Sequence, residues 1–221
     1  MSVKAKITLS DKELSLVLDP EFILTKRSII DKVYDLFAIM TARLQSILAD
    51  AGNLPNELRF SVPKISKGEN YLQLPYVMLD YPRFFGKEDV FAVRTMFWWG
   101  NFFSITLIAS GVFRKLIDTD EIWKDENLKE ILFVNVNPDP WHHHFEADNV
   151  RICKSLSADE WQAITSGNPH LKFALKYELS RWNEMPVLLE DGYRLIERLL
   201  INSRGDGRVP SPGIPKAGSD L

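Results

Sequence analysis

Residues 141–146 (WHHHFE) are the side chains whose types best suit chemistry. If this segment forms a strand, alternate side chains share one face, and His142, His144 and Glu146 project together. Neutral imidazoles and a carboxylate can bind zinc, and two histidines with one carboxylate suit non-haem iron. The pattern therefore admits a metal-dependent, hydrolase-like enzyme with zinc or iron as its cofactor. An exposed polar strand face beside a turn explains the same residues without a metal, and we favour this simpler interpretation.

Three charged residues form a second candidate site. Asp80 and Arg83 lie where a strand predicted over residues 71–81 ends, and loops at strand ends often carry ligand-binding groups. Pairing between the two side chains, or capping of a turn, is the commoner arrangement. Arg94 lies among apolar residues, where a guanidinium is costly to bury without a carboxylate. We therefore expect Arg94 to have a carboxylate partner or to lie at the rim of a sheet.

The patterns of the commoner catalytic sites do not occur in the sequence. Cys153 is the one cysteine and lacks a resolving thiol, so we expect it to be packed in the interior. Residues 64–70 (KISKGEN) lack the second glycine and the Gly-Lys-Ser/Thr ending of a phosphate-binding loop. We predict that this segment is a surface turn. No motif in the chain identifies a family.

Residues 90–111 (VFAVRTMFWWGNFFSITLIASG) are the stretch that organises the rest of the fold. Two apolar, β-branched and aromatic runs flank Gly100-Asn101, a pair that suits a two-residue hairpin turn. With that turn, Trp98 lies opposite Phe103 in the neighbouring strand. The uncharged run 96–113 has about the minimum length of a membrane span, but the central Gly-Asn pair favours a buried hairpin.

The tip of this hairpin is the predicted binding surface. Trp98 and Trp99 lie beside the turn, and exposed aromatic side chains there could contact a protein partner or a second copy of the chain. The same register places Arg94 opposite Leu107. The tip therefore favours a binding function over a catalytic one.

Two helices are predicted near the start of the chain. Ser10 and Glu13 fit a capping box, which favours a helix over residues 11–18, although three leucines at alternate positions would also suit a strand. A long helix then begins after Asp19 and ends before Gly52. Its apolar residues recur at three- and four-residue spacing, typical of a helix with one buried face: Ile29, Val33, Leu36, Phe37, Met40, Leu44, Ile47 and Leu48.

The middle of the chain is rich in strands and its end is helical. Further strands are predicted over residues 131–136, 141–153 and 171–180, and further helices over residues 158–165 and from Pro186 onward. Because strands gather in the middle and helices near both ends, we predict an α+β fold. A central antiparallel or mixed sheet is packed by the N-terminal and C-terminal helices.

The composition limits the class of protein. Hydrophobic residues make up 45% and charged residues 26% of the chain, as in an average soluble globular protein. The net charge of -3 and the pI near 5.9 argue against a nucleic-acid surface, which needs a basic patch. Charged residues interrupt the N-terminal segment before it reaches signal-peptide length, so we predict a cytoplasmic location.

These observations lead to one favoured hypothesis. Residues 1–202 form a single globular domain, and residues 203–221 form a flexible C-terminal tail. The domain is soluble and non-enzymatic, and it binds a protein partner, associates with itself or joins a larger assembly. It has neither a nucleic acid nor a membrane as a partner. The alternative is the metal-dependent enzyme, and the sequence leaves the partner and the pathway open.

Overall fold

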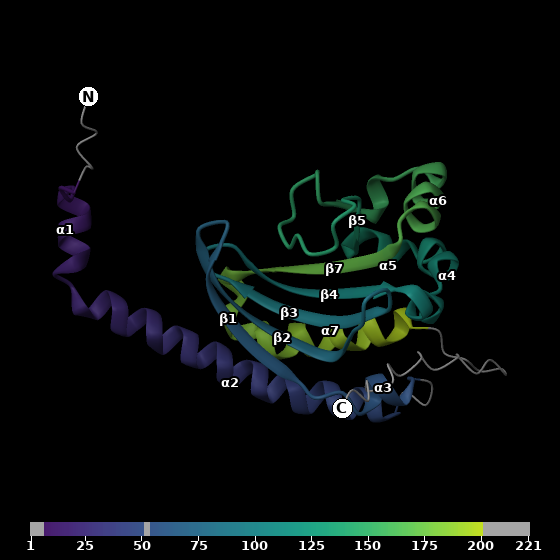
Figure 1. The fold of residues 1–221 in the computed structure, drawn as a ribbon, viewed down its shortest axis with the longest axis horizontal. Coiled ribbons are helices and arrows are strands. Elements are labelled where there is room, and N and C mark those ends of the chain that lie inside the picture. The colour runs from purple at the N-terminus through teal and green to yellow at the C-terminus, as the bar shows by residue number, and fades with distance from the viewer. Residues whose placement is uncertain (1–6, 51–53, 201–221) are drawn as a thin grey trace, which may run out of the picture.

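An antiparallel sheet of seven strands lies at the centre of the structure, in the order β1-β2-β3-β4-β7-β5-β6 (Figure 1). The computed structural model describes residues 7–50 and 54–200. Helices near the two ends of the described chain accompany the sheet, which confirms the predicted α+β class. The predicted tail over residues 203–221 lies outside the described residues.

The strands are β1 (Lys64–Tyr71), β2 (Leu74–Phe85), β3 (Val90–Trp98), β4 (Phe102–Ser110), β5 (Phe133–Asn135), β6 (Val150–Ile152) and β7 (His170–Glu178). The α-helices are α1 (Asp11–Val17), α2 (Pro20–Asp50), α3 (Asn56–Arg59), α4 (Thr119–Lys124), α5 (Glu126–Ile131), α6 (Ala158–Gly167) and α7 (Met185–Leu199). Short 3-10 turns η1 (Gly111–Leu116), η2 (Cys153–Ser155) and η3 (Leu179–Glu184) connect them.

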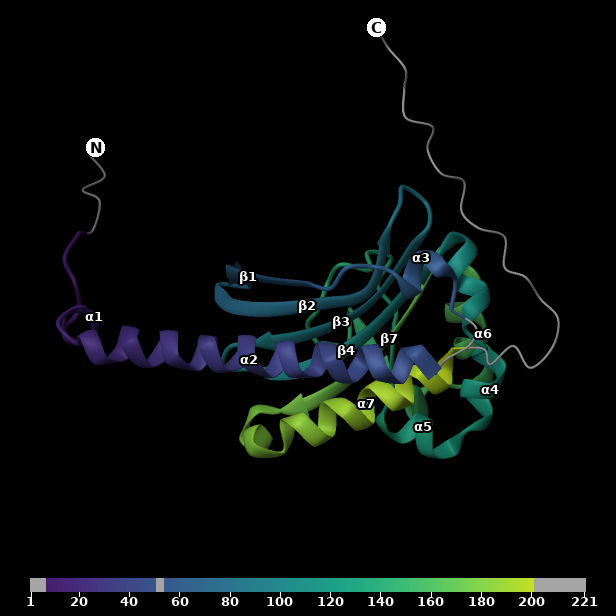
Figure 2. The ribbon, with the colours of Figure 1, turned by 90° about the horizontal axis from the view of Figure 1, so that it is seen from below.

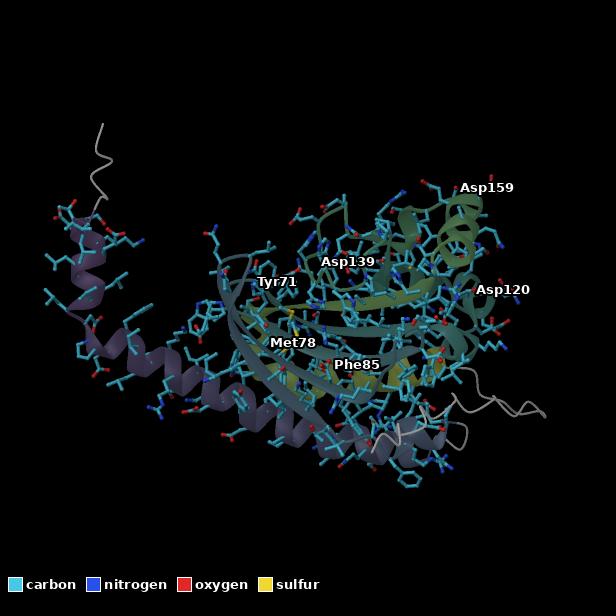
Figure 3. The ribbon with its side chains drawn as sticks, viewed as in Figure 1. Tyr71, Met78, Phe85, Asp120, Asp139 and Asp159 are labelled. Atoms are coloured by element: carbon cyan, nitrogen blue, oxygen red, sulfur yellow. The ribbon has the colours of Figure 1, made fainter. Side chains whose placement is uncertain are left out.

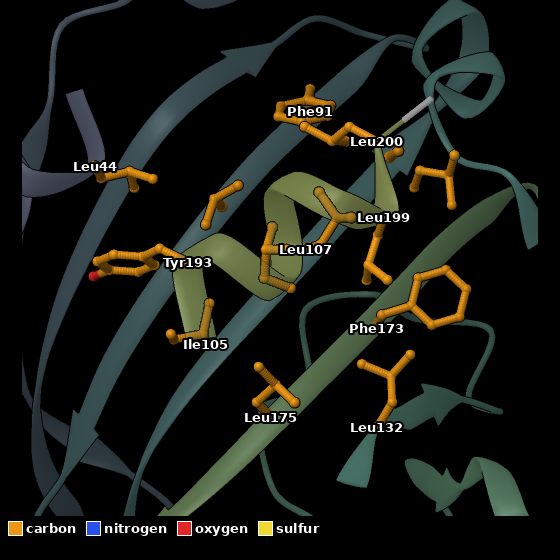
Figure 4. Close-up of a cluster of buried hydrophobic side chains, with 14 of the residues drawn as sticks. Leu44, Phe91, Ile105, Leu107, Leu132, Phe173, Leu175, Tyr193, Leu199 and Leu200 are labelled. Carbon is orange, nitrogen blue, oxygen red and sulfur yellow. The ribbon is translucent and has the colours of Figure 1, made fainter. Parts of the chain in front are cut away.

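Helices α2 and α7 cover one face of the sheet and lie side by side there (Figure 2). The buried stripe of α2 consists of the predicted residues Val33, Phe37, Met40, Leu44 and Leu48. From α7, Tyr193 points into the core, and its hydroxyl lies 2.6 Å from Oγ1 of Thr95 on β3. Figure 4 shows Tyr193 and Leu199 among core side chains of β4 and β7. Burial of these apolar side chains holds the helices on the sheet.

Local sequence signals explain where several elements begin. The predicted capping box from Ser10 to Glu13 is present at α1, and a second capping box runs from Ser157 to Glu160 at α6. In each box the serine hydroxyl accepts a hydrogen bond from the third backbone amide, and the glutamate accepts one from the serine amide. These contacts satisfy backbone donors that the first turn of a helix leaves free.

The hairpin between β3 and β4 is confirmed, but its predicted register is wrong by one residue. Trp98 lies opposite Phe102, not Phe103, and Arg94 lies opposite Thr106, not Leu107. Gly100 has φ of +72°, and the amide of Asn101 donates to the carbonyl of Trp98 at 3.0 Å. The turn therefore closes around Trp99 as well, which makes it three residues long.

The register matters because a shift of one residue exchanges the two faces of a strand. In the predicted register, the face of Arg94 is apolar. In the structure, this face carries Ser104 and Thr106 from β4 and Asp80 from β2. The side of the sheet opposite α2 and α7 therefore carries polar side chains beside a small apolar cluster of Met78, Met96, Trp98 and Phe102.

Two further predictions are wrong. Residues 64–70 are not a surface turn but most of β1, an edge strand whose polar side chains face solvent while its backbone pairs with β2. Residues 141–149 are not a strand, since only Val150–Ile152 of the predicted segment pairs, with β5. The amides of Asp139 and Trp141 instead donate to side-chain oxygens two residues earlier, which folds the segment into turns.

Among the described residues, we find no helix that is both long and apolar enough to cross a membrane. The uncharged run 96–113, which has about the minimum length of a span, instead belongs mainly to β3 and β4.

Candidate functional site

Four charged or ionisable side chains come together between this face of the sheet, opposite α2 and α7, and one loop. We call Asp80, Arg94, His143 and Lys172 the charged cluster, and residues 136–149 the covering loop. Asp80, Arg94 and Lys172 come from β2, β3 and β7, and His143 comes from the covering loop itself. Figure 3 labels Asp139 in the covering loop, and Tyr71 and Met78 on the strands below it. Strand alternation thus places side chains that are distant in sequence in one cluster.

Arg94 is the central residue of the charged cluster. Its Nε lies 2.7 Å from Oδ1 of Asp80 and its Nη2 lies 3.0 Å from Oδ2, so the ion pair is made at two points. Nη1 lies 3.0 Å from Nε2 of His143, and the guanidinium lies over the ring of Trp141 at 5.5 Å. The expected carboxylate partner of Arg94 is therefore present, and it is Asp80.

His143 is held in its neutral form. Burial lowers its pKa well below the usual value, and the nearby charges of Arg94 and Lys172 lower it further. Because a guanidinium has only donors, Nε2 of His143 accepts the hydrogen bond from Arg94. The amides of His143 and His144 both donate to the hydroxyl of Tyr71, at 2.6 and 3.1 Å. The covering loop is therefore attached to β1 as well as to β3.

Lys172 is the least exposed of the four, at 2%. Its ammonium group donates to the carbonyl of His142 in the covering loop. Within the described ranges it forms no ion pair. Burial, followed by the charge of Arg94, lowers the pKa of Lys172 from 10.5 to about 8. The ammonium is therefore easier to deprotonate than that of an ordinary lysine.

The predicted metal ligands are not brought together. The ring centroids of His142 and His144 are 5.6 Å apart. Nε2 of His142 lies 3.7 Å from Oδ2 of Asp139, and Nδ1 of His144 lies 3.8 Å from Oδ1 of Asp148. Glu146 is exposed, and the alternation of a strand does not apply to this loop. Across residues 7–50 and 54–200, no three His, Cys, Asp or Glu side chains are placed to hold a metal ion.

Asp80 and Arg83 do not form a common site. A register shift between them separates the two side chains, and Asp80 points to Arg94. Nε of Arg83 donates to the carbonyl of Val62 at 3.0 Å, and its guanidinium lies over Phe85 at 5.9 Å. Arg83 thus fastens the end of β2 to the segment before β1.

The hairpin tip is not an exposed aromatic surface. Trp98 is only 6% exposed, because Tyr71 of β1 packs against its ring at 5.1 Å and Phe102 at 5.3 Å. Its Nε1 donates to the carbonyl of Tyr71 at 3.2 Å. Trp99 is half-buried, with its ring 6.0 Å from that of Phe97. Both tryptophans therefore stabilise the fold, and the predicted exposure of the tip is wrong for Trp98.

These contacts give the charged cluster a structural role. Its hydrogen bonds connect the covering loop to β1, β3 and β7, and the Trp141 ring stacks over it from the loop side. Chemically, it contains a neutral imidazole and a lysine with a lowered pKa, both buried. The cluster clamps the covering loop to the sheet.

A second candidate lies at the other end of the molecule. We call residues 7–24 the N-terminal arm; it comprises the lead-in, α1 and the first residues of α2, and it extends past the edge of the sheet (Figures 1 and 2). Helix α1 has no buried residue. The ion pair between Lys26 and Glu69 of β1, at 2.7 Å, lies where α2 reaches the sheet.

The arm is strongly apolar for an exposed segment. Eighteen large apolar side chains are exposed among the described residues, and nine of them lie in the arm. The nine are Ile7, Leu9, Leu14, Leu16, Val17, Leu18, Phe22, Ile23 and Leu24. Scattered exposed apolar residues are ordinary, but such a concentration marks an interaction site.

Phe22, Ile23 and Leu24 show that the apolar surface runs around the helix. Successive residues of an α-helix point about 100° apart, so these three side chains face in three directions. They are 45%, 57% and 57% exposed. A helix turn that is apolar all round is normally buried on several sides.

A shallow groove between α2 and α7 lies on the outer side of the helical layer. Its cavity measures about 440 Å³ and is lined by Ala42, Arg43, Ser46, Ile47, Glu190 and Arg194. Glu190 accepts hydrogen bonds from both arginines. The groove therefore combines small side chains with two guanidinium groups that share one carboxylate.

The sequence interpretation missed the arm, although two signals for it exist. Phe22, Ile23 and Leu24 are consecutive and so do not fit the single apolar stripe of α2. In addition, the 31 residues of α2 measure about 46 Å at 1.5 Å per residue. The nine residues of β3 measure about 30 Å at 3.3 Å per residue, so such a sheet cannot cover the whole helix.

Comparison with protein families, with curated proteins and with solved structures finds no match for this chain. A function is therefore inferred from the residues of the chain itself.

Proposed function

We propose that this protein is a non-enzymatic module that binds protein through its N-terminal arm, residues 7–24. The observation that supports this most is the concentration of half of the exposed large apolar side chains in that segment. The hypothesis of a binding module thus stays the same, and its surface moves from the hairpin tip to the arm.

The area of the arm is that of a protein interface. With about 150–200 Å² for each fully exposed large apolar side chain, the nine side chains expose roughly 900 Å². The largest apolar patch on a typical monomer is about 300–600 Å², whereas a standard interface buries about 800 Å² on each partner. Leaving so much apolar surface in water is unfavourable, so a partner that covers the arm is stabilised by its burial.

The charges of the arm favour a protein over a membrane surface. Its charged residues are Asp11, Lys12, Glu13, Asp19 and Glu21, so the arm is acidic. Helices that lie on anionic membranes carry lysine and arginine on their polar face. An acidic, apolar helix instead suits a protein groove with a basic rim.

Site-specific photo-crosslinking in the cells that produce the protein tests this function. A benzophenone amino acid replaces Ile23 in the arm, and in a separate variant it replaces Phe60 as a control. Phe60 is 76% exposed and lies outside the arm, so the two positions match in accessibility.

We expect irradiation to give a discrete crosslinked protein from position 23 and none from position 60. If both positions give the same faint pattern, the arm is not a binding surface and the proposed function is wrong.

A further inference from the structure

Building on this proposed function, we infer that the partner of the arm is a second copy of this chain. Two copies pair their α2 helices antiparallel, about a two-fold axis between residues 31 and 32. The arm of each copy then lies in the α2–α7 groove of the other. Such an interface is isologous, because the same surface of both copies takes part.

The charges on the exposed side of α2 are complementary to themselves in this arrangement. Arg27, Asp31, Lys32 and Asp35 are all exposed, and in the described part of one copy none of them forms an ion pair. In an antiparallel pair about this axis, Asp31 of one copy lies next to Lys32 of the other. Arg27 of one copy lies next to Asp35 of the other. Because the two copies are related by symmetry, each of these two contacts occurs twice, which gives four ion pairs.

The apolar residues on the same side of α2 match in the same register. Leu24 of one copy lies opposite Ile39 of the other, and these side chains are 57% and 54% exposed. Ala38 and Ala42 flank Ile39 and are small, so the two helices can approach closely. The ion pairs therefore set the register, and Leu24 and Ile39 supply apolar contact on both sides of the axis.

The α2–α7 groove of one copy covers those sides of the other copy's arm that do not face α2. In the same register, Glu21 reaches the level of Arg43, whose guanidinium lines the groove together with that of Arg194. Val187 lies one turn before Glu190 on α7 and is 64% exposed, which continues the groove as an apolar surface. An arm in this position contacts α2 and α7 together, which explains why Phe22, Ile23 and Leu24 face in different directions.

The opposite charges of the arm and the groove favour the same pairing. The arm is acidic around Asp19 and Glu21, and the two arginines of the groove share only one carboxylate, Glu190. Opposite charges across an interface fix its register and speed association. With two arms covered, the total buried area reaches the size of a standard stable interface, about 1,600 Å².

Two single-cysteine variants test the geometry on the full chain. Asp31→Cys places a thiol next to the proposed axis, and Ser46→Cys places one on the same side of α2 but about four turns away. Cys153, the native cysteine, is fully buried and does not compete. Each variant is oxidised mildly, and the covalent dimer is quantified by non-reducing electrophoresis.

We expect Asp31→Cys to crosslink to itself and Ser46→Cys to remain monomeric. A parallel pair of helices would crosslink both variants, and a chain that binds only foreign proteins would crosslink neither; each of these results overturns the inference.

A charge reversal provides the second test. Arg27→Asp and Asp35→Arg each place like charges opposite one another, so we expect either variant to raise the dimer dissociation constant about tenfold in sedimentation equilibrium. The double variant restores opposite charges and should return the constant to that of the wild type. Asp159→Arg on α6, at the far side of the molecule from α1 (Figure 3), is the control with no expected effect.

The proposed pairing is wrong if both single variants are monomeric and the double variant does not dimerise again. A crosslink from Ile23 to a different protein, with a wild type that stays monomeric, would retain the proposed function but reject this inference. The two proposals can therefore fail separately.

Discussion

Arg94 and Asp80 form a two-point ion pair across β2 and β3, with Nε–Oδ1 at 2.7 Å and Nη2–Oδ2 at 3.0 Å. Their side chains are 11% and 7% exposed. The pair lies at the base of the contacts that hold the covering loop, because Arg94 also donates to His143. A carboxylate on β2 thus supports a loop that lies more than 50 residues later in the sequence.

Asp80→Ala is expected to destabilise the fold by about 3–5 kcal/mol, because it leaves a buried guanidinium without its counter-charge. Replacing both partners, as Asp80→Leu with Arg94→Met, should recover most of this loss, since neither buried charge remains. Urea unfolding measures each free energy. As a control, Glu130→Ala removes the exposed ion pair with Lys154 and should cost less than about 1 kcal/mol. If Asp80→Ala and Glu130→Ala lower the free energy of unfolding equally, the role given to the Asp80–Arg94 ion pair is wrong.

Acid should weaken the attachment of the covering loop through His143. The pKa of His143 is lowered in the folded protein, so below about pH 6.5 the unfolded chain binds more protons than the folded one. The free energy of unfolding therefore falls as the pH drops below that value. His143→Gln keeps an acceptor for Arg94 but cannot titrate, so its free energy should vary less with pH.

The slope of the free energy of unfolding against pH measures the contribution of His143. A full proton difference changes the free energy of unfolding by about 1.4 kcal/mol per pH unit. Burial also lowers the pKa of His170, whose ring contacts Asn135 and the backbone of Asn137 and not Arg94. His143→Gln and His170→Gln should therefore both flatten the profile. A profile that His143→Gln leaves unchanged would count against a neutral His143.

Raising the pH above about 8 should stabilise the folded protein through Lys172. Its pKa is lowered to about 8, so between about pH 8 and 10.5 the unfolded chain binds more protons and folding becomes more favourable. Cys153 acts in the other direction above about pH 9, because burial raises the pKa of its thiol to about 12. The useful quantity is therefore the difference between wild type and Lys172→Met, measured by urea unfolding.

We expect this difference to shift in favour of the wild type by about 1–3 kcal/mol as the pH rises from 7 to 10. A constant difference would mean that the buried amine does not titrate in this range.

Much of the fold follows from local patterns in the sequence. The capping box predicted at Ser10 is confirmed, and one is also present at Ser157, because each depends on side chains three residues apart. Helix α2 follows from the spacing of its apolar residues, and the carboxylate partner of Arg94 follows from the cost of burying a lone guanidinium. Each of these expectations depends on the chain near one residue.

Features that depend on distant segments could not be predicted in this way. The turn at Gly100 can close with two or three residues, and only the pairing of the whole sheet determines which. Strand β1 is polar because it lies at an edge, so its sequence resembles a turn. Likewise, the charged cluster joins residues from three strands and the covering loop, and no spacing in the sequence brings His143 to Arg94.

Gly192 on α7 is required for the close approach of the helix to the sheet. A Cβ atom at this position would lie 2.2 Å from the hydroxyl of Tyr177 and 2.6 Å from Cδ1 of Ile105. Gly192→Ala should therefore destabilise the protein by about 1–3 kcal/mol, although alanine favours helices. Gly167→Ala on α6 is the control, because a Cβ atom there would meet no other atom within 4 Å and the change should be neutral or stabilising. A stabilising Gly192→Ala would show that the helix can move away from the sheet at little cost.

The apolar arm is the central claim, and sedimentation equilibrium of the full chain tests it most directly. We predict that the wild type sediments as a particle of twice 25.4 kDa at micromolar concentration. A variant with Phe22→Ser, Ile23→Ser and Leu24→Ser should sediment as a folded monomer of 25.4 kDa, since these side chains are exposed in a single copy. If wild type and variant are both monomers at every concentration, and crosslinking in cells gives the same pattern from position 23 as from position 60, the arm is not an interface.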